Sequence, residues 1–383
     1  MIKKVVFTVT PIYSIPPKSA AAVETWIYKV AQRISIKNKI ICIRNEGYEE
    51  KTHISDNCSI YRIKFGKIYT RLFKKWTRLD PFSYAVRITS TSKKFFDNES
   101  CDNAIIVHNN IKLFLKINSR IKNENIILHM HNMLDPAPLP ENVKIIVPSK
   151  FLSNWYEERK PQASIKIVPN GFSLENYQQL PESQVVRSEC GFKESDKIIL
   201  FAGRFSPEKG IIELMRAVKM LHEKDSSIRL ALIGNPEASI KGEKVAYQQE
   251  VKDFAKQNMT GYCFFLGSKS PDEMHKYFSL ADLVAVPSIV DEAFCMVALE
   301  GMAAGKPVIV SPRGGMTEFV INGETGFHFS SPMSAESMAS DLDKALKHPR
   351  RLEIASCAKN YAFSHYTWEH VSKDLERVLG EWF

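Results

Sequence analysis

Two glutamates, Glu292 and Glu300, stand eight residues apart in the segment DEAFCMVALEGMAAGKPVIV, residues 291–310. The pattern predicts a short strand before this segment (283–287), a helix within it, and a strand at its end (307–310). The exposed backbone amides at the start of the helix favour an anionic ligand. Carboxylates do not bind an anion, so the two glutamates are free to hold hydroxyl groups on either side of it.

The spacing of the two glutamates argues against a glycosidase. Eight residues of a helix rise about 12 Å and separate two side chains by about 80°. The paired carboxylates of glycosidases lie roughly 5 to 9.5 Å apart. We therefore interpret Glu292 and Glu300 as the two ends of a clamp on one long ligand. The alternative is a solvated loop glutamate followed by an unrelated helix glutamate.

A second segment, KIILFAGRFSPEKG at residues 197–210, places two cations between a strand and a helix. Gly203 allows a tight exit from the strand. Arg204 and Lys209 follow it, on the kind of connection where α/β sheets bind ligands. A planar guanidinium and a mobile ammonium suit a diphosphate. Together with the glutamate segment, this pair favours a diphosphate site over a basic loop paired with nearby acids.

GRFSPEKG followed by an E-x7-E segment resembles glycosyltransferase family 4, the retaining enzymes of GT-B architecture that use nucleotide sugars. The motifs VPNGF (168–172) and ADLVAVPS (281–288) and the terminal YTWEHVSKDLERVLGEWF extend the resemblance over essentially the whole chain. The segments KKVVFTVTPIYSIPPKSAAAVETWIY, KKWTRLDP and HMHN are similar to the lipopolysaccharide-core N-acetylglucosaminyltransferases of enteric bacteria. Those enzymes act on the outer core of the lipid-anchored oligosaccharide.

The resemblance implies an α/β fold with two Rossmann-like domains facing a cleft. An acceptor-binding domain would span 1–168, a nucleotide-sugar-binding domain 169–365, and a helix (366–383) would cross back onto the first domain. The residues independently predict two parallel sheets with helices on both faces, because strands and helices alternate twice. The expected strands are 4–10, 39–43, 59–65, 104–108, 125–130, 144–148, 165–168, 197–202, 228–233, 263–266, 283–287, 307–310 and 326–329.

The resemblance also implies a role for each residue of the two segments. Arg204 and Lys209 would neutralise the departing diphosphate, together with backbone amides at the helix start. Glu292 would hold hydroxyls of the donor sugar, and Glu300 those of the ribose. The expected donor site is Gly203, Arg204, Lys209, Glu292, Glu300 and, through their amides, Phe294, Cys295 and Met296. The expected catalytic residues are Glu292, His131, Arg204 and Lys209.

Neither a cofactor nor a divalent metal is expected, because the nucleotide sugar is a substrate and cations with helix amides can stabilise its leaving group. No residue stands out as a covalent nucleophile. That absence fits a front-face substitution with retention, in which the leaving phosphate takes the proton of the acceptor.

Three histidines and one acidic pair need separate interpretation. His129 and His131 are two apart in a strand and so face the same side, but no third metal ligand is near them in sequence. The resemblance places His131 at the interdomain cleft beside the sugar, whereas His129 is interpreted as core packing. His108 ends another strand, and whether it lines the acceptor cleft stays open. Asp341 and Asp343 imitate a DxD metal motif but fall in an amphipathic helix, so we interpret them as surface charge.

Residues 64–94 hold nine Lys or Arg against one acid, with aromatic residues interleaved, while the whole chain has a net charge of +9. Such a segment can bind an anionic bilayer, phosphorylated sugar or nucleic acid, or can be a solvated face whose aromatics point inward. No nucleic-acid motif accompanies it. We therefore expect the phosphorylated lipopolysaccharide core and an anionic membrane surface as partners, contacted by Lys18, Lys67, Arg71, Lys74, Lys75, Trp76 and Arg78.

Bulk properties agree with a two-domain enzyme. The 383 residues are 44% hydrophobic, enough to bury two cores. The seven cysteines form no CxxC pair and are read as reduced packing residues. The N-terminal apolar run is too short for a signal peptide, and no stretch reaches the ~20 apolar residues of a membrane span. We expect a cytoplasmic protein, peripherally associated with the cytoplasmic face of the inner membrane.

The sequence therefore predicts a retaining glycosyltransferase that moves a hexosamine, N-acetylglucosamine from UDP-N-acetylglucosamine, onto the outer core of lipopolysaccharide. UDP-glucose or another hexose donor is an alternative within the same class. A nucleotide-sugar epimerase or hydrolase would instead form product without an acceptor. An inactive carbohydrate- or membrane-binding protein is a third possibility, which has no need for the diphosphate-binding pair Arg204 and Lys209.

Overall fold

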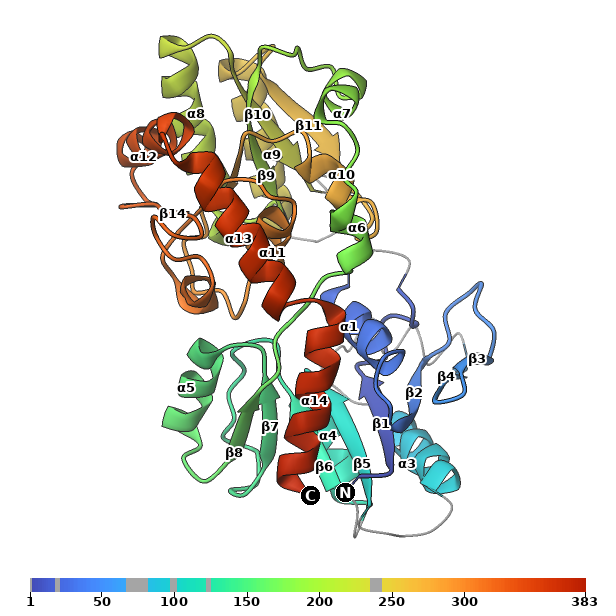
Figure 1. Cartoon of the computed structure of the whole chain (residues 1–383). Coiled ribbons are helices and arrows are strands. Elements are labelled where there is room, and N and C mark those ends of the chain that lie inside the picture. The colour runs from blue at the N-terminus through green and yellow to red at the C-terminus, as the bar shows by residue number, and fades with distance from the viewer. Residues whose placement is uncertain (1, 18–20, 67–81, 97–101, 122–124, 235–242) are drawn as a thin grey trace. The chain divides into compact units, whose positions relative to one another are not determined.

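The computed structural model (Figure 1) describes the chain except for residues 1, 18–20, 67–81, 97–101, 122–124 and 235–242. The chain forms two compact units. Unit 1 is Met1–Gly171 together with Trp368–Phe383, and unit 2 is Phe172–Thr367. The sequence had suggested a boundary three residues earlier, after residue 168.

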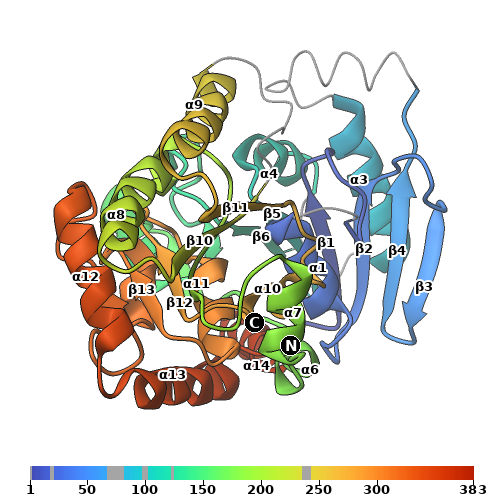
Figure 2. The same ribbon diagram turned by 90° about the horizontal axis from the view of Figure 1, so that it is seen from above.

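Unit 1 contains an eight-stranded sheet with the order β3-β4-β2-β1-β5-β6-β7-β8. Every neighbouring pair is parallel except β3 and β4. Figure 2 shows these two strands side by side at one edge of the sheet. The strands are β1 Lys4–Val9, β2 Lys37–Ile43, β3 Lys51–Ser55, β4 Cys58–Ile63, β5 Asn103–His108, β6 Asn125–His129, β7 Lys144–Val147 and β8 Ser164–Ile167.

The helices of unit 1 are α1 Ala22–Ala31, α3 Phe82–Phe96, α4 Ile111–Asn118, α5 Lys150–Arg159 and α14 Trp368–Trp382. The last helix carries buried residues at helical spacing, including Val371, Leu375 and Val378, and they join the core that contains Trp26 and Ile27 of α1. The C-terminal helix thus packs on the N-terminal unit, as the resemblance implied.

Unit 2 contains a six-stranded, all-parallel sheet with the order β11-β10-β9-β12-β13-β14. Its strands are β9 Lys197–Ala202, β10 Ile228–Ile233, β11 Cys263–Gly267, β12 Leu283–Val286, β13 Val308–Val310 and β14 Phe327–His328. Its α-helices are α6 Leu174–Gln178, α7 Ser183–Glu189, α8 Ile211–Lys224, α9 Glu243–Asn258, α10 Met274–Phe278, α11 Met296–Ala303, α12 Ala335–Lys347 and α13 Arg351–His365. One parallel sheet and one that is parallel except at its β3 edge confirm the predicted α/β fold.

The strand order of unit 2 creates a point at which the chain changes direction across the sheet. The chain runs from β9 outward through β10 to β11, then returns to the other side of β9 to form β12. Ligands of open α/β sheets bind beyond the carboxyl ends of the strands at such a switch point. The loops that follow β9 and β12 are therefore the place to look for a site.

The strand β3 was not predicted, since the expected strands included none between residues 43 and 59. Lys51–Ser55 has no buried residue, and within the described chain its one neighbouring strand is β4, in an antiparallel hairpin. An edge strand with both faces near solvent carries no apolar alternation by which it could be recognised.

Within the described part of the chain, no helix is long and apolar enough to cross a membrane.

Removing the side chain of Leu375 tests how firmly α14 is anchored. Leu375→Ala leaves a cavity in the unit 1 core, so we expect a loss of about 2–5 kcal/mol in the free energy of unfolding of that unit. Gly380→Ala in the same helix adds a methyl group with no atom within 4 Å and should stabilise it by about 0.5–1 kcal/mol. Denaturant unfolding measures both. If both variants changed the free energy of unfolding by the same amount, the packing of α14 would not depend on its buried face.

Candidate active site

The loops after β9 and β12 meet at the switch point of unit 2. The amide of Ile289, after β12, donates to the carbonyl oxygen of Glu208, after β9, at 3.0 Å. Gly210 ends the short 3-10 helix Pro207–Lys209 with φ +65°, and a side chain there would overlap the carbonyl oxygen of Pro287. Only glycine fits this close left-handed turn, which brings the preceding Lys209 next to the β12 loop.

Lys209 and Glu292 form an ion pair across these two loops. The Lys209 Nζ contacts Oε1 of Glu292, and the hydroxyl of Ser288 donates to the same oxygen at 2.6 Å. Both charged side chains are mostly buried, at 19% and 17% exposure. The other carboxylate oxygen, Oε2, has no hydrogen-bond partner among the residues that the structure describes. It can therefore accept a hydrogen bond from a ligand.

The loop after β13 supports Glu292 from a third side. The amide of Gly315 donates to the Glu292 carbonyl oxygen at 2.7 Å. Any side chain on Gly314, whose φ is +59°, would overlap the backbone of Glu292. The sequence analysis missed Ser288, Gly314 and Gly315. The adjacent glycines in RGGMTE were the available signal, because paired glycines mark a close backbone approach.

Arg204 does not join this cluster. Its side chain is 70% exposed, and its guanidinium lies 3.8 Å from the carboxylate of Glu208. Such an exposed pair contributes little to stability, so the guanidinium can turn to an anionic ligand at small cost.

The helix that carries Glu300 begins at Met296, four residues after Glu292. Glu292 lies in the loop before the helix, so the rise and rotation of a continuous helix do not describe the separation of the two glutamates. The N-cap residue, Cys295, has φ +85° and makes no side-chain capping hydrogen bond. The N-terminus of α11 thus keeps its preference for an anion.

Phe294 and Cys295 contribute little besides their backbone. The Phe294 ring is buried against Phe319, with 5.1 Å between ring centroids. Burial raises the pKa of the Cys295 thiol to about 12. The side chains of both residues therefore serve packing, and only their amides are suited to an anion.

Glu300 lies in the second turn of α11 and is partly exposed. Burial raises the pKa of its carboxyl to about 8. The pKa of Tyr177 is raised well above its ordinary value, first by burial and then by the charge of Glu300. None of the described residues donates a hydrogen bond to the Glu300 side chain, so its oxygens are available to hydroxyl groups.

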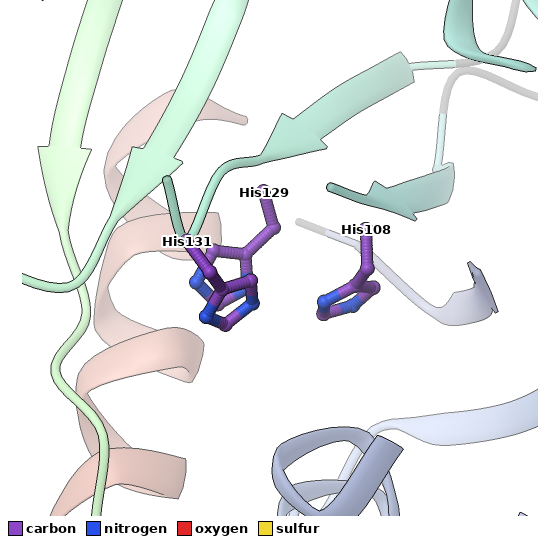
Figure 3. Close-up of side chains that lie close together, drawn as sticks. All are labelled: His108, His129 and His131. Carbon is purple, nitrogen blue, oxygen red and sulfur yellow. The ribbon is translucent and has the colours of Figure 1, made fainter. Parts of the chain in front are cut away.

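In unit 1, His131 lies with His129 and His108 (Figure 3). The ring centroids of His131 and His129 are 4.1 Å apart, and those of His108 and His129 are 4.8 Å apart. His129 is fully buried and packs on Trp26, as the core interpretation expected. His108 is also fully buried. The third histidine that was missing from the local sequence is supplied by the neighbouring strand.

Only one residue of the DxD-like pair is surface charge, as had been expected of both. Asp341 and Asp343 do lie in α12. Asp343 forms a surface ion pair with Lys347. The Asp341 side chain is only 11% exposed, however, and it accepts bonds from the amide and hydroxyl of Ser330. Asp341 therefore fastens the loop before α12 and is not simply surface charge.

The residues expected to bind the acceptor and the membrane lie outside the described residues. They are Lys18, Lys67, Arg71, Lys74, Lys75, Trp76 and Arg78.

Comparison with known proteins defines the class to which this fold and site belong. Residues 183–363 match the model of the family Glycosyl transferases group 1. The chain is also 50% identical, over the full length of both proteins, to the lipopolysaccharide 1,2-N-acetylglucosaminetransferase of Salmonella typhimurium. The chain belongs to the group 1 glycosyltransferases and is an enzyme of that class.

Solved structures confirm the GT-B architecture. Sucrose-phosphate synthase from Thermosynechococcus elongatus superposes with a TM-score of 0.77 at 18% identity, with 99% of each chain covered. Alr3699/HepE from Anabaena, solved in complex with UDP and glucose, superposes with a TM-score of 0.74 at 19% identity, covering 99% of this chain and all of the other.

The turn at Gly210 can be tested against a matched glycine. Gly323 has φ +79°, but a methyl group added there would meet no atom within 4 Å, so Gly323→Ala should cost only the left-handed strain, roughly 1–2 kcal/mol. Gly210→Ala adds overlap with Pro287 and should cost more in the free energy of unfolding of unit 2. Denaturant unfolding compares the two variants. Equal losses would mean that the approach of the two loops is not tight.

Proposed function

We propose that the protein transfers N-acetylglucosamine from UDP-N-acetylglucosamine to the outer core of lipopolysaccharide, with retention of configuration and without a metal at the diphosphate. The observation that carries the proposal is the full-length 50% identity to a lipopolysaccharide 1,2-N-acetylglucosaminetransferase. The site in unit 2 supports it, because two cations, a free helix N-terminus and two carboxylates match the parts of a nucleotide sugar.

Lys209 and Glu292 would act on opposite sides of the bond that breaks. Lys209 and the exposed Arg204 neutralise the diphosphate as it leaves, together with amides at the start of α11. Glu292 keeps Oε1 on Lys209 and Ser288 and offers Oε2 to a hydroxyl of the donor sugar. Because the carboxylate is already held, donor binding does not have to order it.

Retention follows from substitution on a single face of the sugar. The bond from the anomeric carbon to the phosphate oxygen breaks as the acceptor oxygen forms its bond on the same face. The acceptor proton passes to the leaving phosphate. His131 would lie beside the sugar, and Glu300 would hold the ribose hydroxyls.

Contact with the membrane would come from the basic segment 64–94. Its excess of cations matches both the phosphorylated core and the anionic leaflet that carries the acceptor. We propose that the protein associates peripherally with the cytoplasmic face of the inner membrane. Such binding weakens as salt screens the charges.

Transfer to lipopolysaccharide truncated before its terminal core sugar is the direct test. We expect label to enter the lipid fraction from UDP-N-acetylglucosamine and not from other nucleotide sugars. Label from UDP-glucose would contradict the donor assignment and keep the class. Release of free sugar or an epimer without acceptor would show that the protein is a hydrolase or an epimerase. The absence of any product from every donor would favour a binding protein.

The same assay tests the role of Glu292. Glu292→Ala removes the hydroxyl acceptor and leaves Lys209 unpaired, so we expect at least about a 100-fold loss of transfer rate. Glu324→Ala, at an exposed glutamate of unit 2, is the matched control and should keep full activity. Circular dichroism establishes that both variants fold. Full activity in folded Glu292→Ala would show that the sugar site lies elsewhere.

Glu300 makes donor binding dependent on pH. Its carboxyl, with a pKa of about 8, is protonated in the free protein at neutral pH, whereas ribose hydroxyls donate best to the ionised form. Binding should therefore release a proton, and affinity for UDP-N-acetylglucosamine should rise from pH 6.5 toward pH 8, by at most about tenfold per unit. Calorimetry in buffers of different ionisation enthalpy measures both effects.

The variant Glu300→Gln should bind the donor more weakly and without that pH dependence. If the dependence of donor affinity on pH were unchanged in the variant, Glu300 would not be part of the ribose site.

A further inference from the structure

Three histidines of unit 1 meet at the carboxyl ends of two neighbouring strands. His108 is the last residue of β5 and His129 the last of β6, and the two are directly paired in the parallel register. His131 follows two residues later. Unit 1 changes direction between β1 and β5, so the histidines lie next to its switch point, where this type of sheet binds ligands.

The side-chain nitrogens of these histidines are buried without partners. Both nitrogens of His108, both of His129 and the Nε2 of His131 make no hydrogen bond within the described chain. Buried polar atoms are normally satisfied, and five orphaned nitrogens in one place need an explanation. Ring packing does not supply it, since Trp26 contacts the histidines only through its rings.

The cluster is in the protonation state that binds metals. Burial lowers the pKa of His108 and His129 well below the ordinary value and that of His131 to about 3. Among the described residues, only the other histidines of the cluster influence these pKa values through their charge. The three rings are therefore neutral at physiological pH, and neutral imidazole is the ligand form of histidine.

The geometry brings one nitrogen of each ring within reach of a single ion. These atoms lie within 4.8 Å of one another. Nitrogens on one tetrahedral zinc ion, at about 2.0–2.1 Å from it, lie about 3.4 Å apart, so modest rotations of the rings close the site. Figure 3 shows the three side chains pointing into the same space, His108 and His129 from the ends of their strands and His131 from the loop after β6.

We infer that His108, His129 and His131 form a binding site for a divalent transition metal, best fitted by zinc. Three imidazoles without a carboxylate suit zinc and disfavour magnesium or calcium, which prefer oxygen ligands. Of the three histidines only His131 is a partly exposed residue, so an ion would keep its fourth position on that side. The ion would join the ends of β5 and β6 and fix the ring of His131. The site is independent of the diphosphate in unit 2, which uses other residues.

The test uses full-length protein without a histidine tag. After growth with zinc and dialysis, we expect one equivalent of zinc by elemental analysis, and the bands of tetrahedral cobalt after exchange with cobalt(II). His108→Gln and His129→Gln should each weaken zinc binding at least about tenfold in competition with a chromophoric chelator. His53→Gln, at an exposed histidine of the same unit, is the matched control and should bind as the unchanged protein does.

Thermal unfolding provides a second readout that does not depend on activity. Zinc should raise the melting temperature of the unchanged protein and of His53→Gln, but not that of His131→Gln, a substitution at the one partly exposed residue of the cluster. Zinc bound equally by a variant lacking all three histidines would be an adventitious ion only and would overturn the inference. So would an unchanged protein that binds no zinc or cobalt and melts at the same temperature with and without zinc.

Discussion

The ion pair between Lys209 and Glu292 is the interaction on which the unit 2 site depends. It joins loops that follow β9 and β12, whose strands lie side by side at the switch point. Loss of either partner would leave a mostly buried charge uncompensated, which costs far more than the pair itself contributes. The pair therefore holds two loops in register while keeping both charges in place for a ligand. Glycines 210 and 314 permit it, because a side chain at either would push the loops apart.

The other charged groups of the site, Arg204 and Glu300, differ from this pair in exposure and in protonation state. The Arg204 side chain is mostly exposed, whereas Glu292 is held by Lys209 and Ser288. Burial raises the pKa of the Glu300 carboxyl to about 8, so this group is largely protonated at neutral pH. The two glutamates therefore differ, since Glu292 is held in an ion pair and Glu300 is uncharged in most molecules.

Local patterns predicted most of the fold, and contacts between distant segments account for what they missed. Buried parallel strands such as β9 and β10 were found with their observed bounds, because continuous apolar runs between turn residues are a local signal. The exposed β3 carries no such signal. The residue types of the site were also predictable, but the contact of Lys209 with Glu292 spans 83 positions and depends on strand order. His108 joins His129 for the same reason, through β5–β6 pairing.

The same topology places polar side chains at the switch point of each unit, but with opposite consequences. In unit 2 the side chains of Lys209, Ser288 and Glu292 bond to one another, so this part of the site is formed before a ligand arrives. In unit 1 five of the six nitrogens of the histidine rings are buried without a hydrogen-bond partner in the described chain, and the His129 ring packs on Trp26. Hydrophobic packing alone would have been served better by apolar residues, since each unpaired polar atom is penalised. A bound group from outside the chain would remove this penalty by bonding to the nitrogens, and a metal ion bonds to three of them at once.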